Sequence, residues 1–271
     1  MKGVVKRLAR ECGFELAGVA PPGPVPERLL PPARSVICTG KLYNTGADGR
    51  IVSRYAQGLD YHDVVRAGLD RLAARLKDEF GPFECKACVD TSPVPERALA
   101  RRAGLGWIGK NTCLINQPMG SWFFLGELIT SLDLEPDQPP PDRCGTCTRC
   151  IQACPTQALV PFEGRWTLDP RRCIAWLTIE NRGEIPDDLR PLMGTRVFGC
   201  DICQEVCPWN RRAPLTPDPA FAPRNTGLGL ENLAALDEDE FRRRFRPTPV
   251  WRTKHRGLMR NVKIALANSG R

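Results

Sequence analysis

The chain has 271 residues, 13 of them cysteine, and a formal net charge of +8. That length allows one large domain or two smaller ones with a real hydrophobic core. No apolar run approaches the roughly 18 residues of a membrane span, and the N-terminal segment lacks the apolar core of a signal peptide. We therefore expect no membrane association. The positive charge favours an anionic partner, above all a nucleic acid.

Short helices and strands should alternate over the first part of the chain. Apolar residues at helical spacing predict a helix over residues 2–12, and short apolar runs predict strands over 14–20 and 35–39. A longer helix should begin near Asp60, because its apolar residues recur on one face until Gly81 closes it. This alternation predicts a mixed N-terminal domain, of the α+β class.

The middle of the chain continues this pattern. Residues 83–89 contain a C-x2-C pair with no second pair nearby, so we interpret both cysteines as strand residues. Asp90 should end that strand, with a helix between Pro95 and Gly104. Residues 116–130 are the most apolar segment, and their periodicity is compatible with either a buried strand or a helix.

Eight of the cysteines follow the pattern of bacterial ferredoxins. The first run is C-x2-C-x2-C-x3-C-P, in which the fourth cysteine binds the second cluster of a pair. The second run has one cysteine fewer, and an isolated cysteine supplies the missing ligand. We assign Cys144, Cys147, Cys150 and Cys207 to one 4Fe-4S cluster, and Cys154, Cys173, Cys200 and Cys203 to the other. Paired C-x2-C motifs also bind zinc, but a four-cysteine run that ends in Cys-Pro is unusual for zinc.

A stiff, proline-rich linker over residues 135–142 is the expected domain boundary. The sequence thus predicts an α/β domain over residues 1–134, a ferredoxin-like domain over 143–212 and a basic helical extension over 213–271. An acidic and then basic run, 237–246, begins the charged part of that extension, and Arg252, Lys254, Arg256, Arg260 and Lys263 follow it. Such a run is either a solvated helix face or a surface for phosphates.

His62 does not match the pattern of a cobalt-binding histidine. Cobalamin enzymes that bind cobalt through histidine carry D-x-H-x-x-G, and Asp60-Tyr-His62 begins that way. Position 65 is valine, however, and the glycine is missing. We therefore expect a surface or capping histidine and no cobalt ligand.

Several segments occur together in the order seen in one enzyme family. They are residues 54–62, 90–96, 103–111, 120–127, 177–180 and 207–211, together with both cysteine runs. On these motifs, which cover most of residues 50–212, the chain resembles epoxyqueuosine reductases. These enzymes use cobalamin and iron–sulfur clusters to complete queuosine in tRNA.

The resemblance implies a reaction, its cofactors and its partners. An epoxide in the tRNA anticodon loop would lose its oxygen, with electrons passing from an external low-potential donor through two 4Fe-4S clusters to cobalamin. The cofactor would lie between the N-terminal and cluster domains, without a histidine on cobalt. A monomer is expected. A cytoplasmic location is also expected, because the clusters need a reducing compartment.

The resemblance also implies roles for individual residues. Reductive opening of an epoxide takes two electrons and leaves an oxyanion that needs a proton, and the family's proton donor corresponds to Asp90. Since a free aspartate is ionised at neutral pH, we expect burial to raise the pKa of Asp90. A helix-capping role for Asp90 is the alternative. Asp201 is expected to approach the corrin ring, and further corrin contacts are expected from Ser53, Tyr55, Gly106, Lys110 and Asn111.

Two other functions use similar features. Reductive dehalogenases also place cobalamin beside two cubane clusters, although their export signal is missing here and their chemistry leaves the net charge of +8 without a purpose. A ferredoxin-type electron carrier, or an RNA-binding module with structural clusters, would need neither cobalamin nor the motifs over residues 50–127. Failure to bind cobalamin would favour that second reading.

Overall fold

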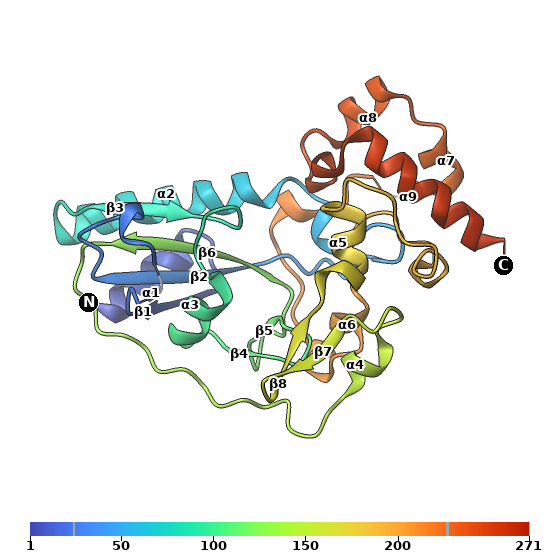
Figure 1. The fold of residues 1–271 in the computed structure, drawn as a ribbon. Coiled ribbons are helices and arrows are strands. Elements are labelled where there is room, and N and C mark those ends of the chain that lie inside the picture. Colours follow the sequence, from blue (N-terminus) through green and yellow to red (C-terminus); the bar gives the residue numbers. More distant parts are fainter. Residues whose placement is uncertain (24, 226–227, 271) are drawn as a thin grey trace.

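The computed structural model of the chain describes residues 1–23, 25–225 and 228–270 (Figure 1). Its strands are β1 (Leu16–Ala20), β2 (Ser35–Leu42), β3 (Cys85–Cys88), β4 (Trp107–Ile108), β5 (Leu114–Ile115), β6 (Phe123–Thr130), β7 (Leu159–Phe162) and β8 (Arg165–Leu168). Its α-helices are α1 (Lys2–Glu11), α2 (Tyr61–Phe80), α3 (Glu96–Arg102), α4 (Arg149–Ala153), α5 (Ile174–Ile179), α6 (Ile202–Glu205), α7 (Leu230–Ala234), α8 (Glu238–Phe245) and α9 (Lys254–Ser269). Short 3-10 helices cover Glu27–Leu29, Arg54–Ala56, Pro170–Arg172, Pro191–Met193, Pro208–Asn210, Pro219–Phe221 and Pro249–Thr253.

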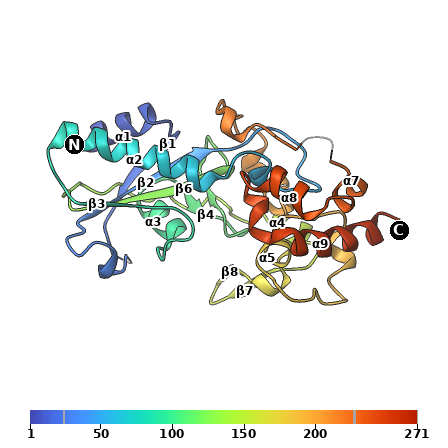
Figure 2. The ribbon, with the colours of Figure 1, turned by 90° about the horizontal axis from the view of Figure 1, so that it is seen from above.

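A four-stranded sheet with the order β1-β2-β6-β3 organises the N-terminal part. Helices α1 and α2 cover one face and α3 covers the other (Figure 2). All neighbouring strands are antiparallel, so the α+β class describes this part, and a parallel α/β sheet does not. The apolar segment whose periodicity was ambiguous contains the central strand β6, where Glu127 lies opposite both Cys38 and Cys88.

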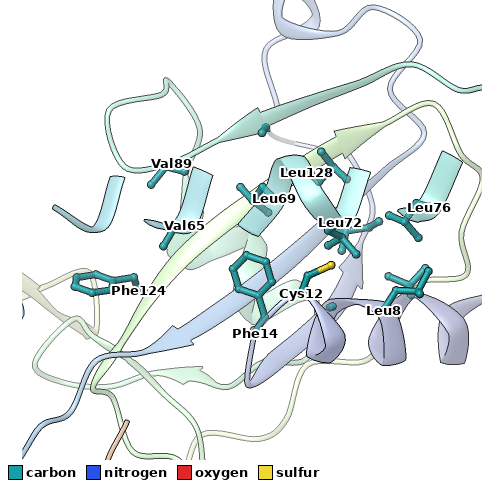
Figure 3. Packing of buried hydrophobic residues seen from close by; sticks show 14 of the residues in the cluster. Leu8, Cys12, Phe14, Val65, Leu69, Leu72, Leu76, Val89, Phe124 and Leu128 are labelled. Atoms are coloured by element: carbon teal, nitrogen blue, oxygen red, sulfur yellow. The ribbon is translucent and has the colours of Figure 1, made fainter. Parts of the chain in front are cut away.

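The long helix α2 confirms the prediction from its apolar spacing. Asp60 caps its first turn, and Gly81, at φ 81°, follows its last residue. Leu69, Leu72 and Leu76 point from α2 toward α1 and β6, where they form the main core (Figure 3). These leucines are fully buried, and each contributes about 1.5–3 kcal/mol through burial. This packing holds the first turn of α2 in place beside the sheet.

The proline-rich segment 133–144 has no helix or strand, as predicted. Contacts near its centre, at Asp137, fix it to the N-terminal part of the protein. The Asp137 carboxylate accepts the backbone N–H of Val19 at 3.0 Å and pairs with Lys6 at 2.8 Å. The segment therefore runs along the edge of the sheet before it enters the cysteine-rich part (Figure 1). There, Cys144, Cys207 and Trp209 form a small hydrophobic cluster with Trp107 of β4 and Ile115 of β5.

After the second cysteine run the chain returns to the N-terminal sheet. The backbone N–H of Thr216 donates to the Asn44 carbonyl at 2.7 Å, and Asp218 pairs with the nearly buried Lys41 at 2.9 Å. Phe221 then joins the same core as α2. These contacts join the segment that follows the cysteine-rich part to the N-terminal sheet.

The basic C-terminal segment is helical, as predicted, but much of it is packed and not solvated. Helices α7, α8 and α9 form a core with Phe198, and the buried Asn261 amide donates to the carbonyls of Thr178 and Val197 at 2.8 Å. Arg260 points inward and donates to three carbonyls, those of Leu177, Asn181 and Gly183. The prediction of a solvated or phosphate-binding face is therefore wrong for Arg260.

Ion pairs within α8 occupy its basic residues. Arg242 pairs with Asp239, and both Arg243 and Arg244 pair with Glu240. None of the helices in residues 1–23, 25–225 and 228–270 is long and apolar enough to cross a membrane.

Candidate functional site

A polar-edged cleft of about 380 Å³ lies between the sheet and the cysteine-rich part. Aromatic side chains form much of its wall, and we call it the aromatic cleft. Its lining residues are Tyr43, Tyr55, Tyr61, Asp90, Glu96, Arg97, Cys113, Leu114, Ser121, Phe123, Phe124, Leu125 and Gln204. The Tyr61 ring stacks on Phe124 at 4.2 Å, so the first turn of α2 is fixed against β6 at the cleft. Flat, apolar walls of this kind suit a planar macrocycle with polar edges.

Asp90 lies in this cleft, just after β3. Its backbone is in the left-handed region at φ 42°, which costs a residue other than glycine about 1 kcal/mol or more. The Glu96 carboxylate accepts the Asp90 backbone N–H at 2.5 Å. At the other end, Oδ2 of Asp90 accepts the Tyr61 hydroxyl at 2.8 Å and lies 3.2 Å from Nε2 of His62. Asp90 is therefore held from both sides in a strained conformation, with its carboxylate 44% exposed.

His62 bridges two carboxylates. Its Nδ1 lies 2.7 Å from Oδ1 of Asp60, which also caps α2, and its Nε2 faces Asp90. The hydrogen bonds to Asp60 and Asp90 raise the pKa of His62 to about 9, although burial opposes them. At neutral pH this imidazole is protonated.

Burial does act to raise the pKa of Asp90, but the expected net rise is wrong in this structure, where the pKa is lowered. The hydrogen bond from His62 is the largest influence, and with that from Tyr61 it outweighs burial and lowers the Asp90 pKa. Burial and the Asp90 charge raise the pKa of the Tyr61 phenol, which stays a hydrogen-bond donor. The proton that the sequence analysis placed on Asp90 therefore lies on its neighbour His62.

Two more carboxyl groups lie behind Asp90. Burial raises the pKa of Glu96 to about 7, and the charge of Asp90 contributes. Glu127 is fully buried in β6, where burial and then Glu96 raise its pKa well above the ordinary value. Burial therefore favours the neutral form of Glu127, and Glu96 titrates near neutrality.

Most of the residues that were expected to contact the corrin ring contact other parts of the protein in the structure. Tyr55 does line the aromatic cleft. Asp201 is 3% exposed and accepts the Ser53 hydroxyl at 2.5 Å and the Arg54 backbone N–H at 2.8 Å. Burial raises the Asp201 pKa. The carboxylate thus fastens the segment around Ser53 to the second cysteine run.

The glycine-rich loop faces the cysteines and not the aromatic cleft. Lys110 donates to the carbonyls of Gly145 and Cys147 at 2.7 and 3.0 Å, and the Asn111 amide lies 3.3 Å from the Cys203 carbonyl. A Cβ at Gly106 would lie 2.2 Å from the Ile115 carbonyl oxygen, so glycine is needed there for packing against β5.

The four cysteines that were assigned to one of the two clusters line a common cavity of about 250 Å³. Cys144, Cys147, Cys150 and Cys207 all line it, with Lys110, Asn111, Arg143 and Arg149 among the other residues. We call this the outer thiol set. A cavity with a cysteine on several sides fits a cubane cluster better than a bare ion. In the part of the chain that the structure describes, no three His, Cys, Asp or Glu side chains are placed to hold a single metal ion.

The other four cysteines form an inner thiol set nearer the cleft. Cys154 and Cys203 each influence the pKa of Cys173, and Cys203 influences that of Cys200, so these side chains are close together. Cys203 is followed by Gln204, which lines the aromatic cleft together with Cys113, and the Cys203 carbonyl accepts the Asn111 amide at 3.3 Å. The inner set thus lies beside the aromatic cleft, and the outer set lines a cavity of its own.

Sequence reasoning assigned no role in the site to Tyr61, to His62, which was expected to be a surface or capping histidine, to Glu96 or to Cys113. The first three flank Asp90 within motifs that the sequence analysis had already singled out, so the signal was present in the segments 54–62 and 90–96. Cys113 stands outside the ferredoxin pattern, and no spacing rule indicates it.

Comparisons with known proteins agree with this arrangement. Residues 143–210 match a family model described as a 4Fe-4S double cluster binding domain, and residues 25–91 match one described as epoxyqueuosine reductase QueG, DUF1730. An epoxyqueuosine reductase of Xanthomonas campestris is 48% identical over 257 residues, which are 90% of this chain and 72% of that protein. One of Pseudomonas aeruginosa is 49% identical over 222 residues, 80% of this chain and 60% of that protein.

Solved structures give the same result. A crystal structure of an epoxyqueuosine reductase with an epoxyqueuosine-modified tRNA stem loop is similar with a TM-score of 0.90 and 31% identity, over 98% of this chain and 81% of that one. The catabolic reductive dehalogenase NpRdhA is similar over 77% of this chain and 32% of that one, with a TM-score of 0.53 and 19% identity. That second likeness concerns the fold alone.

Proposed function

This chain belongs to the epoxyqueuosine reductase family, and from that premise we propose that it converts epoxyqueuosine to queuosine in the anticodon loop of tRNA. One observation carries the proposal: Asp90 lies in the aromatic cleft beside a protonated histidine, and two sets of four cysteines lead to the same cleft. Such an arrangement can bring electrons and a proton to one place.

We propose that cobalamin occupies the aromatic cleft, with Tyr55 and Asp90 among its contacts, and that each thiol set holds one 4Fe-4S cluster. When bound, these groups would supply a centre that can accept two electrons and carriers that provide them singly at low potential. Thiols must lose their protons to hold such a cluster, and burial raises the pKa of Cys150 to about 11.

The protein's own part in the reaction is proton transfer. Removing the epoxide oxygen as water takes two electrons and two protons. Asp90 is exposed to the cleft and can reach substrate, while His62 holds a proton 3.2 Å behind it. We propose that Asp90 delivers the proton to the opening epoxide oxygen and that His62 replenishes it. Tyr61 keeps the carboxylate oriented through its 2.8 Å hydrogen bond.

We propose tRNA as the substrate. The relative with a TM-score of 0.90 is described with a modified tRNA stem loop, and the net charge of +8 suits a polyanion. The chain spans 72% and 60% of the two relatives named above, so its grip on tRNA is part of the proposal. The monomeric state and the cytoplasmic location also remain predictions.

An anaerobic assay tests this function. Reconstituted protein is mixed with cobalamin, a low-potential reductant and tRNA that carries epoxyqueuosine. The tRNA is then digested, and the masses of its nucleosides are measured by mass spectrometry. The expected result is the loss of one oxygen from the modified base, dependent on cobalamin. Asp90→Asn should keep both cofactors and lose turnover. Conversion by that variant at the unmodified rate would refute the acid role, and the absence of cobalamin binding would leave only a two-cluster electron carrier.

A further inference from the structure

Five basic side chains surround the outer thiol set. Lys110, Arg143 and Arg149 line its cavity, and Arg211 and Arg212 line a neighbouring depression. The two hollows share Pro208 and Trp209, so they form one continuous surface. We call these five residues the basic rim.

The charge of the basic rim is available to a partner. Arg143, Arg149, Arg211 and Arg212 are exposed, and none of the four forms an ion pair with any residue that the structure describes. By contrast, three arginines of α8 are paired within their own helix. Asp142 is nearby, and its carboxylate accepts the Cys144 backbone N–H at 2.7 Å. One negative charge beside five basic side chains leaves the rim with a net positive charge.

The position of the rim is the second observation. The inner thiol set includes Cys203, and the next residue, Gln204, lines the aromatic cleft, while the outer set opens toward the rim. Electrons bound for the cleft would therefore enter at the outer set. The half-buried Trp209, packed edge-on against Trp107 at 5.1 Å, gives this surface the kind of aromatic anchor that protein interfaces favour.

We infer that the basic rim is the docking surface for a small acidic protein that carries one electron at low potential. The inference rests on the proposed two-cluster function. The carrier is oxidised by one electron at each encounter as the cluster in the outer set is reduced by one, so two encounters supply the two electrons that an epoxide takes. Opposite charges would steer the encounter and fix its orientation, with the strongest effect at low salt.

A reduced acidic flavodoxin serves as the probe. The first variant is Arg211→Gln with Arg212→Gln, whose side chains lie outside the thiol cavity. The second is Arg143→Gln with Arg149→Gln. The matched control is Arg242→Gln, Arg243→Gln and Arg246→Gln, which removes more charge at a different hollow. Iron content confirms that each protein carries its clusters.

Two quantities are measured against ionic strength: the Kd of the oxidised flavodoxin for each protein, and the rate at which reduced flavodoxin bleaches the cluster absorbance. We expect each rim variant to bind about tenfold or more weakly at low salt and to be reduced correspondingly more slowly, with a shallower salt dependence. The control should match the unmodified protein. Reduction by methyl viologen radical, which needs no docking, should stay the same in the first variant.

Three outcomes would overturn the inference. Unchanged Kd and bleaching rates in both rim variants would refute it. Weaker binding of tRNA with unchanged flavodoxin kinetics would assign the rim to the RNA. Clusters that methyl viologen cannot reduce even in the unmodified protein would refute the proposed two-cluster function, and the docking role with it.

Discussion

His62 is the residue whose replacement tests the proposed acid most directly. The rise of its pKa from 6.5 to about 9 corresponds to about 3 kcal/mol in favour of the imidazolium. The contacts with Asp60 and Asp90 both contribute to this free energy, and the His62 side chain is 29% exposed to solvent, which weakens them. We therefore assign about 1 kcal/mol to the contact with Asp90. His62→Gln keeps a hydrogen-bond donor near Asp90 but removes the titratable proton.

The expected result is a change in the pH dependence of kcat/KM. In the unmodified protein the paired proton is lost as pH rises through about 9, so activity should fall there. In His62→Gln, Asp90 would titrate alone and nearer its ordinary value of about 3.9. We expect a loss of about 100-fold at pH 7 to 8, partly recovered toward pH 5, with cobalamin affinity unchanged.

Stability supplies an independent readout. The folded pKa of His62 is raised, so its contribution is full below about 6.5 and is lost as pH rises through about 9. The Tm of the unmodified protein should therefore drop across that window relative to His62→Gln. Other charged groups near Asp90, such as Arg252, are the same in both proteins. An unchanged pH–rate profile together with parallel Tm curves would refute the reasoning.

Three further replacements test other parts of the structure. Tyr61→Phe removes a hydrogen bond to Asp90, so kcat/KM should fall up to about tenfold and the apparent Asp90 pKa should rise; a pH–rate profile that stays the same would contradict this. Asp201→Asn presents an amide to two donors and should cost about 1–3 kcal/mol of unfolding free energy in denaturant titrations. If cobalamin affinity is also unchanged, the expected corrin contact of Asp201 is wrong. Leu72→Ala should lower the free energy of unfolding by about 2–5 kcal/mol. The control Leu215→Ala, at a site 63% exposed, should change it by less than about 0.5 kcal/mol. Equal effects would mean that the packing in Figure 3 is not what stabilises α2.

Much of the fold and site was predictable because the information is local in the sequence. Helix α2 follows from the spacing of its leucines, the cap at Asp60 and the glycine after its last turn, all within one short segment. The ferredoxin pattern follows from cysteine spacing, which is set by how a short loop wraps a cluster. The position of Asp90 after a strand also agrees with the structure.

Tertiary structure decided the properties that depend on which distant groups meet. Asp90 and His62 are 28 residues apart, and only the packing of α2 against β6 brings them together. That contact reverses the expected direction of the Asp90 pKa shift, because the hydrogen bond from His62, together with that from Tyr61, outweighs burial. Lys110 and Asn111 face the cysteines because folding packs their loop against residues that are distant in the sequence, Cys147 and Cys203. The sequence by itself determined local features such as α1, α2 and β2, because their signals lie within one short segment. Tertiary structure decided that residues 123–130 form a strand and not a helix, and it also decided the ionisation state of the site, since both depend on neighbours that only the folded chain brings into contact.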